Sequence, residues 1–219
     1  HNFKHHTYTN IKGMDDDIGY GLLRLFPEQR WKPGYLLQPI YSIPFCLLFQ
    51  WGVAIQNLEL GKYFKGRKTK EQTLEEWKPM QRKIGKQLFK DYVFFPIIAG
   101  PNAIPVFTGN AVANVIRSLW ASAVIFNGHF TEDAETFEAD NTENETKAEW
   151  YLRQIRGSSN FTGGKWMHFM SGNLSHQIEH HLYPDVPARR YRQMAPKVQA
   201  VCEKYGLNYN NASLVKQYG

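Results

Sequence analysis

One histidine spacing occurs twice in the 219-residue chain, once at its start and once towards its end. His1-Asn2-Phe3-Lys4-His5-His6 and His176-Gln177-Ile178-Glu179-His180-His181 both have the form H-x3-H-H. If such a segment is helical, positions i, i+4 and i+5 share one face, so its three imidazoles converge. Imidazole is a suitable ligand for iron, zinc, copper and nickel. The two copies together predict a metal site to which both parts of the chain contribute.

Two long tracts contain almost no charge, although charged residues make up 21% of the chain. Residues 35–55 have no charged side chain and are long enough to cross a bilayer core of about 30 Å. Pro39 and Pro44 would kink a helix that crosses there. A re-entrant or interfacial segment is therefore equally allowed.

Residues 92–127 form the second apolar tract, which Gly100-Pro101-Asn102 and Pro105 interrupt. The interruption predicts two arms of about 17 residues, each near the shortest length for a membrane span, with a turn between them. Arg117 is the only charged residue of the tract, and we expect it to face protein or to snorkel. A helical hairpin in the core of a soluble protein is the alternative interpretation.

A strongly basic segment separates the two apolar tracts. Its ten cationic residues are Lys62, Lys65, Arg67, Lys68, Lys70, Lys78, Arg82, Lys83, Lys86 and Lys90. The positive-inside rule predicts that this loop faces the cytoplasm. A solvated helix of a soluble protein would explain residues 71–86 alone, but not the flanking tracts. The net charge of the chain is +6, yet no basic and aromatic nucleic-acid module accompanies it, so no nucleic-acid partner is expected.

Histidines that share one metal site must lie on the same side of a membrane. A hairpin over residues 92–127 crosses the membrane twice and so meets this condition. Residues 35–55 must then form a re-entrant or an interfacial segment and not a complete crossing. The predicted fold is all-α: an integral membrane helical hairpin with a cytosolic helical cap, residues 128–219, that carries a histidine-rich metal site. Such a site at the mouth of a hairpin suits a lipid substrate.

The two histidine segments resemble the second and third histidine boxes of the membrane fatty acid desaturase family. The resemblance covers His1-Asn2-x-x-His5-His6-x-Tyr8-Thr9-Asn10, the segment from His176 to Pro184, the hairpin and Pro187-Ala188-Arg189-Arg190-Tyr191. It is closest to bacterial acyl-lipid and acyl-CoA desaturases. The family's first box, H-x3-4-H, is absent. We therefore expect residues 1–219 to be the C-terminal part of one desaturase domain, inactive alone, with the first box upstream of His1.

The resemblance implies a site that holds two iron ions and uses O2. It also implies electrons from a ferredoxin or cytochrome b5-type donor and a fatty acyl-CoA or acyl-lipid substrate in the membrane. The implied ligands are His1, His5, His6, His129, His180 and His181, with either His176 or Gln177 to complete the third box. His168 is a candidate for a position next to the ligands, and a purely structural role is its alternative.

Other functions fit part of this pattern. A related di-iron hydroxylase or ketolase would share the histidine boxes, and only its products would distinguish it. A zinc hydrolase is disfavoured because zinc sites take three or four protein ligands, whereas at least six histidines are available and no HExxH is present. A truncated membrane segment without metal is the non-enzymatic alternative. For His129 alone, capping the C-terminus of a helix is the alternative to metal binding.

Overall fold

A computed structural model describes residues 4–15, 17–27, 29–56, 58–64, 66–142 and 144–217 of the chain. Helices make up most of these residues. The chain divides into two compact units: residues 1–32 with 122–219, here called the histidine unit, and residues 33–121, the hairpin unit. The prediction of a mainly helical fold is therefore confirmed, and the prediction of a single domain stays a prediction.

The regular elements among the described residues of the hairpin unit are all helices. It contains the 3-10 helix Pro33–Leu37, α2 (Gln38–Leu47), α3 (Phe49–Gln56), α4 (Leu60–Phe64), α5 (Lys70–Phe89), the π-helix Lys90–Phe94, α6 (Phe95–Ile98), the 3-10 helix Gly100–Asn102 and most of α7 (Ala103–His129). Helix α7 starts in this unit and ends in the histidine unit.

The first apolar tract forms a broken helix. Pro33–Leu47 and Phe49–Gln56 are bent by 99° relative to each other. Pro39 lies in the first turn of α2, where a missing N–H is tolerated. Pro44 lies inside α2, and the break at Leu48 follows one turn later. The predicted interruption of this tract is confirmed, but Pro39 begins a helix instead of kinking one.

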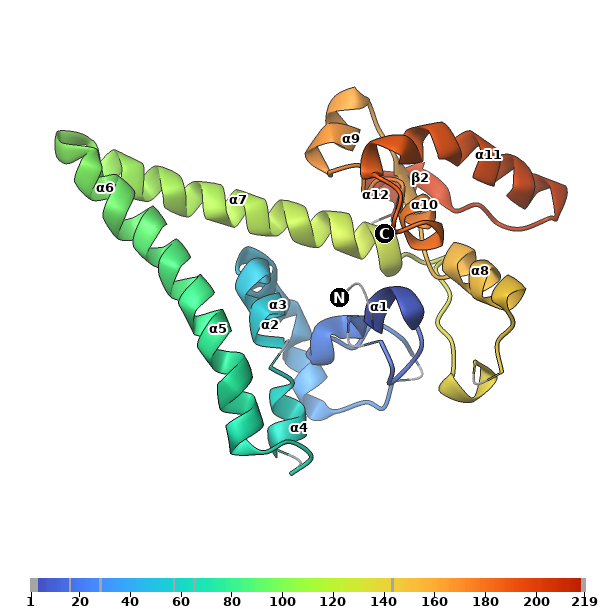
Figure 1. Cartoon of the computed structure of the whole chain (residues 1–219), viewed down its shortest axis with the longest axis horizontal. Coiled ribbons are helices and arrows are strands. Elements are labelled where there is room, and N and C mark those ends of the chain that lie inside the picture. The colour runs from blue at the N-terminus through green and yellow to red at the C-terminus, as the bar shows by residue number, and fades with distance from the viewer. Residues whose placement is uncertain are drawn as a thin grey trace. The chain divides into compact units, whose positions relative to one another are not determined.

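Helices α5, α6 and α7 form a hairpin that turns at Gly100–Asn102 (Figure 1). Gly100 adopts a positive φ of 54°, which glycine tolerates best. The position of the turn agrees with the prediction. Two other expectations are wrong. The basic segment is largely helix α5, because Thr69 starts it with a capping box, and the apolar arms are unequal, since the first is apolar only over residues 92–98.

Polar side chains join the two arms of the hairpin. Asn110 Nδ2 donates a hydrogen bond of 2.6 Å to the Asp91 carbonyl, and Asn114 Nδ2 donates one of 3.0 Å to Oη of Tyr92. The Tyr92 ring packs edge-on against Phe107 at 5.2 Å. No single helix in the described part of the chain has both the length and the apolarity of a membrane span, and only the bent pair around Leu48 has them when its halves are taken together.

The histidine unit combines short helices with a small sheet. Its elements are α1 (Lys4–Thr7), the 3-10 helices Ile18–Gly21, Ala139–Asn141 and Ala188–Arg190, α8 (Lys147–Arg156), β1 (Asn160–Thr162), α9 (Lys165–Met170), α10 (Gln177–Leu182), α11 (Tyr191–Lys204), β2 (Asn211–Ser213) and α12 (Leu214–Gln217). Strands β1 and β2 pair in parallel, a feature that the sequence did not predict. Helix α10 packs between α8 and α11 around Ile155, Ile178, Leu182 and Cys202 (Figure 1).

A buried carboxylate anchors α10 to the C-terminal segment. Glu179 is fully buried and accepts hydrogen bonds from Tyr209 Oη at 2.8 Å and from Asn160 Nδ2 at 2.9 Å. Asn160 Oδ1 also accepts the N–H of Ile178 in the first turn of α10. Burial raises the pKa of Glu179, while these hydrogen bonds oppose the shift. Asn160 and Tyr209 thus fix the orientation of α10, the helix that carries His180 and His181.

Candidate metal centre

Five imidazoles from three helices converge inside the histidine unit. His5 and His6 lie on α1, His129 ends α7, and His180 and His181 lie on α10. The Nε2 atom of His129 is 3.3 Å from Nε2 of His5 and 3.3 Å from Nε2 of His181. The His6 ring centroid lies 4.6 Å from those of both His180 and His181. All except His180 are buried.

Asn10 attaches the first histidine segment to the end of α7. It adopts a positive φ of 55°, which asparagine tolerates better than most residues. Its fully buried Nδ2 group donates hydrogen bonds to the carbonyls of Gly157 at 2.9 Å, Glu135 at 3.1 Å and His129 at 3.3 Å. One amide therefore joins three segments that are more than 100 residues away from it in the sequence.

Arg153 holds the same segment from the side of α8. Its guanidinium donates to the carbonyls of Thr9 at 3.1 Å and Thr7 at 3.0 Å, and it forms a two-fold ion pair with Glu145 at 2.7 Å. The Arg153 side chain is buried and that of Glu145 is 13% exposed. Bidentate pairs of this kind are geometrically specific. The acidic stretch 132–149 therefore supports the cluster through the Glu145 side chain as well as through the Glu135 carbonyl.

Hydrogen bonds at the outer ring nitrogens set which nitrogen faces the cluster. His5 Nδ1 lies 3.0 and 3.1 Å from the two carboxylate oxygens of Asp15. His181 Nδ1 lies 3.2 Å from Oε1 of Gln154. Both partner atoms only accept hydrogen bonds, so the two Nδ1 atoms carry the protons. The Nε2 lone pairs of His5 and His181 consequently point towards His129.

The spacing of these nitrogens fits a bound metal ion. Lone pairs 3.3 Å apart repel each other unless a cation lies between them. Two nitrogen ligands at about 2.1 Å from one metal, and at angles of about 90° to 110°, lie about 3.0–3.4 Å apart. Among the described residues, His5, His129 and His181 form a buried group whose ligand atoms lie within 4.8 Å of one another, and both distances from His129 Nε2 fall in this range.

Burial keeps four of the imidazoles uncharged. It lowers the pKa of His6 and of His180 to about 4, with repulsion from neighbouring histidines as a further cause. The same two causes lower the pKa of His129 and His181 well below the usual value of 6.5. At neutral pH these imidazoles are therefore unprotonated, which is the form that binds metal.

Gln177, not His176, faces the five imidazoles. Its amide nitrogen lies 2.8 Å from Nε2 of His129 and 3.4 Å from Nε2 of His181. Helix α10 begins at Gln177, so His176 precedes the helix and its ring stacks on His168 at 4.9 Å. The expected convergence of His176 with His180 and His181 is therefore wrong. His168 bonds Ser175 at 2.7 Å through Nδ1.

The sequence left some contributors to the cluster unidentified. His1 lies outside the described residues, so its place in the site stays a prediction. Asp15 had no recognised role, yet its side chain is 1% exposed and contacts His5. Gln154 is fully buried on α8 and had no recognised role. Neither residue follows a spacing rule, and only the three-dimensional arrangement places them beside His5 and His181.

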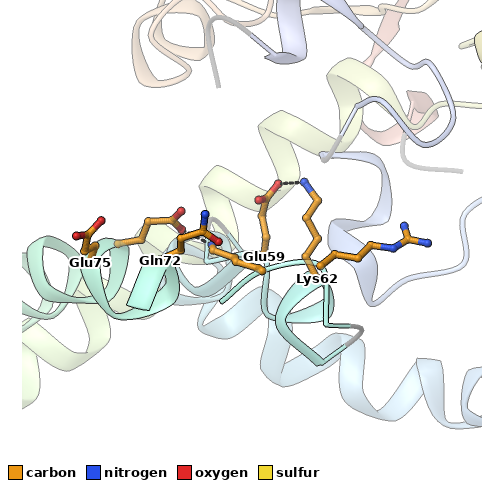
Figure 2. A pocket seen from close by; sticks show the side chains of 7 residues that line it. Glu59, Lys62, Gln72 and Glu75 are labelled. Carbon is orange, nitrogen blue, oxygen red and sulfur yellow. Dashed lines mark hydrogen bonds and ion pairs between the residues drawn. The ribbon is translucent and has the colours of Figure 1, made fainter. Parts of the chain in front are cut away.

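A separate hollow of about 310 Å³ lies in the hairpin unit (Figure 2). It is lined by Glu59, Lys62, Arg67, Lys68, Gln72, Glu75 and Glu76. Lys62 pairs with Glu59 and Lys68 with Glu76, both at 2.5 Å. Its three cations and three carboxylates balance, so the hollow favours neither an anionic nor a cationic ligand.

Comparison with known proteins relates the chain to enzymes of lipid metabolism. The family model described as fatty acid desaturase matches residues 1–213. An NADPH-dependent stearoyl-CoA 9-desaturase of Mycobacterium tuberculosis is 48% identical over 100% of this chain and 52% of its own length. An sn-1 linoleoyl-lipid 6-desaturase of Synechocystis is 31% identical over 95% of this chain and 59% of its own. The chain thus spans about half the length of the curated relatives it matches. No solved structure matches it.

Proposed function

The chain belongs to the fatty acid desaturase family, and we propose on this premise that its histidine cluster is the iron site of an enzyme that inserts a double bond into a fatty acyl chain. The convergence of His5, His129 and His181 on one point, each through Nε2, is the observation that carries this proposal. The activity is assigned to the whole protein, because the chain spans about half the length of its relatives.

The proposed site holds two iron ions. Its proposed ligands are His5, His6, His129, His180 and His181, with His1 from outside the described residues and Gln177 as a further donor. The amide oxygen of Gln177 is buried and has no hydrogen-bond partner among the described residues, so it is available to a cation after rotation of the amide. His176 and His168 are left out, since they pack on each other.

Bound iron supplies the activation of O2 that an unactivated acyl chain requires. In the overall reaction the chain loses two hydrogens, and O2 takes these together with two electrons and two protons to give two waters. The protein contributes burial, which excludes water, and neutral imidazoles, which keep their lone pairs for metal. Asp15, Gln154 and Tyr191 hold the rings of His5, His181 and His180 by their Nδ1 atoms.

We place the hairpin of residues 92–127 in the membrane and the cap of residues 128–219 on the cytoplasmic side. Apolar side chains are exposed at the hairpin turn, with Ile97 at 71%, Ile98 at 66% and Ile104 at 80%. Exposed apolar surfaces of this kind are typical of membrane or protein contacts. The cations of the basic segment end at Lys90, just before the apolar residues begin, as the positive-inside rule favours.

The proposed substrate is a fatty acyl-CoA or an acyl-lipid, and the higher identity to a stearoyl-CoA desaturase favours acyl-CoA. The two electrons come from a one-electron donor of the ferredoxin or cytochrome b5 type. A hydroxylase or ketolase of similar architecture would share the histidines, but no observation on this chain favours it.

Expression of the protein in a host that lacks the activity, followed by fatty acid analysis, tests the proposed function. The expected product is a new monounsaturated or further unsaturated fatty acid, absent when His180→Ala or His181→Ala replaces the wild type. A hydroxy or keto product would reassign the reaction. An unchanged lipid profile, with iron present in the purified protein and a reducing donor supplied, would contradict desaturation.

A further inference from the structure

The imidazoles of the cluster differ in the charge of their partners. His181 Nδ1 faces the neutral amide of Gln154 and the hydroxyl of Thr9, and His180 Nδ1 faces the phenol of Tyr191. His5 Nδ1, in contrast, faces a carboxylate at 3.0 Å. Among these three rings, only that of His5 has an anionic partner, so the cluster is electrostatically asymmetric.

Asp15 is held rigidly in this role. Its side chain is 1% exposed. Oδ2 accepts the backbone N–H of Asn10 at 2.9 Å, and Oδ1 accepts that of Asp17 at 3.0 Å. With the N–H of His5, the carboxylate therefore accepts from three donors, which fix its orientation. The Asp17 carboxylate lies 3.5 Å from His5 Nδ1 and adds a second, more exposed negative charge.

On the basis of the proposed function, we infer that Asp15 is a positioning residue that makes His5 a more electron-donating ligand than His180 and His181. A carboxylate that accepts the Nδ1 proton fixes the ring orientation and raises the basicity of the opposite nitrogen. That nitrogen is the Nε2 atom that points at His129. Metal bound through His5 is thereby stabilised in its more oxidised state relative to metal bound through rings with neutral partners.

The competing interpretation is that Asp15 only holds the loop after α1, since it accepts the backbone N–H groups of Asn10 and Asp17. The two roles give different measurements. A loop residue changes how much protein folds and how much metal is retained, but it leaves the reduction potential of the retained iron unchanged. A residue that acts on His5 changes that potential as well.

The experiment compares purified Asp15→Asn with wild type and with Asp140→Asn, which replaces an exposed carboxylate on the 3-10 helix Ala139–Asn141. Chelator competition with ferrous iron gives the affinity, and a spectroelectrochemical titration gives the midpoint potential. We expect Asp15→Asn to bind iron about 10- to 100-fold more weakly and to have a higher potential, because the anionic partner is lost. Asp140→Asn should match the wild type in both.

A double-mutant cycle tests whether Asp15 acts through His5. In a His5→Ala background, Asp15→Asn should cause no further loss of iron affinity, because the ring it orients is gone. Equal losses in the two backgrounds, or an unchanged potential in Asp15→Asn, would contradict the inference. If Asp15→Asn does not accumulate, Asp17→Asn replaces it: a smaller rise in potential supports the inference, and no rise contradicts it.

The outcome for the wild type separates this inference from the proposed function. If the wild-type protein binds no iron, the proposed function fails. If it binds iron and produces an unsaturated fatty acid while Asp15→Asn behaves like the wild type in affinity and potential, only the role of Asp15 is wrong.

Discussion

The amide nitrogen of Gln177 lies 2.8 Å from Nε2 of His129, although 48 positions separate the two residues. The contact requires close approach of α10 to the end of α7. At Gly128, a Cβ atom would lie 2.9 Å from Cγ of Gln177, closer than such carbon atoms pack. The glycine before His129 therefore makes room for the side chain that stands beside the cluster.

Replacing Gly128 by alanine should displace Gln177 from the cluster. The added methyl group forces a shift in a packed region, a change that costs about 1–3 kcal/mol, while the gain in helix propensity offsets up to about 1 kcal/mol. We expect weaker iron binding and lower activity from Gly128→Ala. Iron content and thermal denaturation of the purified variant measure the effect.

Gly109 provides the matched control on the same helix. A Cβ atom added there would meet no atom within 4 Å. Gly109→Ala should therefore raise stability by up to about 1 kcal/mol through helix propensity and leave iron binding unchanged. Equal iron content in the two alanine variants would contradict the role given to the Gly128 contact.

His129 is expected to behave as a metal ligand and not as a helix cap. A histidine that only interacts with the C-terminal dipole of α7 contributes about 0.3–1 kcal/mol, so its loss would leave iron and activity largely intact. We expect His129→Gln to lose most of its iron and activity even where the protein inserts and accumulates. Near-normal iron content and desaturation in this variant would contradict metal binding by His129 and would support a capping role.

His176→Gln is the control for this substitution, because His176 belongs to the same sequence pattern but stacks on His168. Its iron content should match that of the wild type. An equal loss of iron in His176→Gln and His129→Gln would mean that the variants lose the fold of the unit and would remove the distinction between them.

The sequence predicted the general location of the cluster well and its details less well. The histidine spacing indicated His5, His6, His180 and His181, because i, i+4 and i+5 positions share a helix face. The same rule misplaced His176, since α10 starts one residue later, and helix ends are the least predictable part of a helix. Only the family resemblance indicated His129.

The roles of Asp15 and Gln154 could not be predicted from the sequence, for a different reason. Their roles depend on tertiary contacts between segments far apart in the chain, such as the three hydrogen bonds from Asn10. No local periodicity reports contacts of this kind. The turn at Gly100–Asn102, by contrast, followed directly from local glycine and proline content.

The metal-free protein should lose stability as the pH falls. The pKa values of His6 and His180 are about 4 in the folded protein and 6.5 in an unfolded chain. Between these values the unfolded state binds more protons than the folded state, so the free energy of unfolding decreases from about pH 6.5 to pH 4. Denaturation of the metal-free protein at pH 7.5 and at pH 5 measures this. Equal midpoints would contradict neutral, buried imidazoles.

The proposed topology predicts opposite labelling of two engineered cysteines, after replacement of Cys46 and Cys202 by serine. Asn102→Cys lies at the hairpin turn and should react with an impermeant reagent in intact cells. Lys70→Cys begins α5, whose cations favour the cytoplasm, and should react only after permeabilisation. The reverse pattern at either position would overturn the topology.

The central claim is that the converging imidazoles bind a pair of iron ions, and metal analysis of the purified protein tests it most directly. The account predicts about two iron ions per molecule in the wild type, because imidazole suits iron and several rings share the site. It predicts a marked loss of iron in both His180→Ala and His181→Ala. Zinc in place of iron, or full iron content in both alanine variants, would contradict the claim.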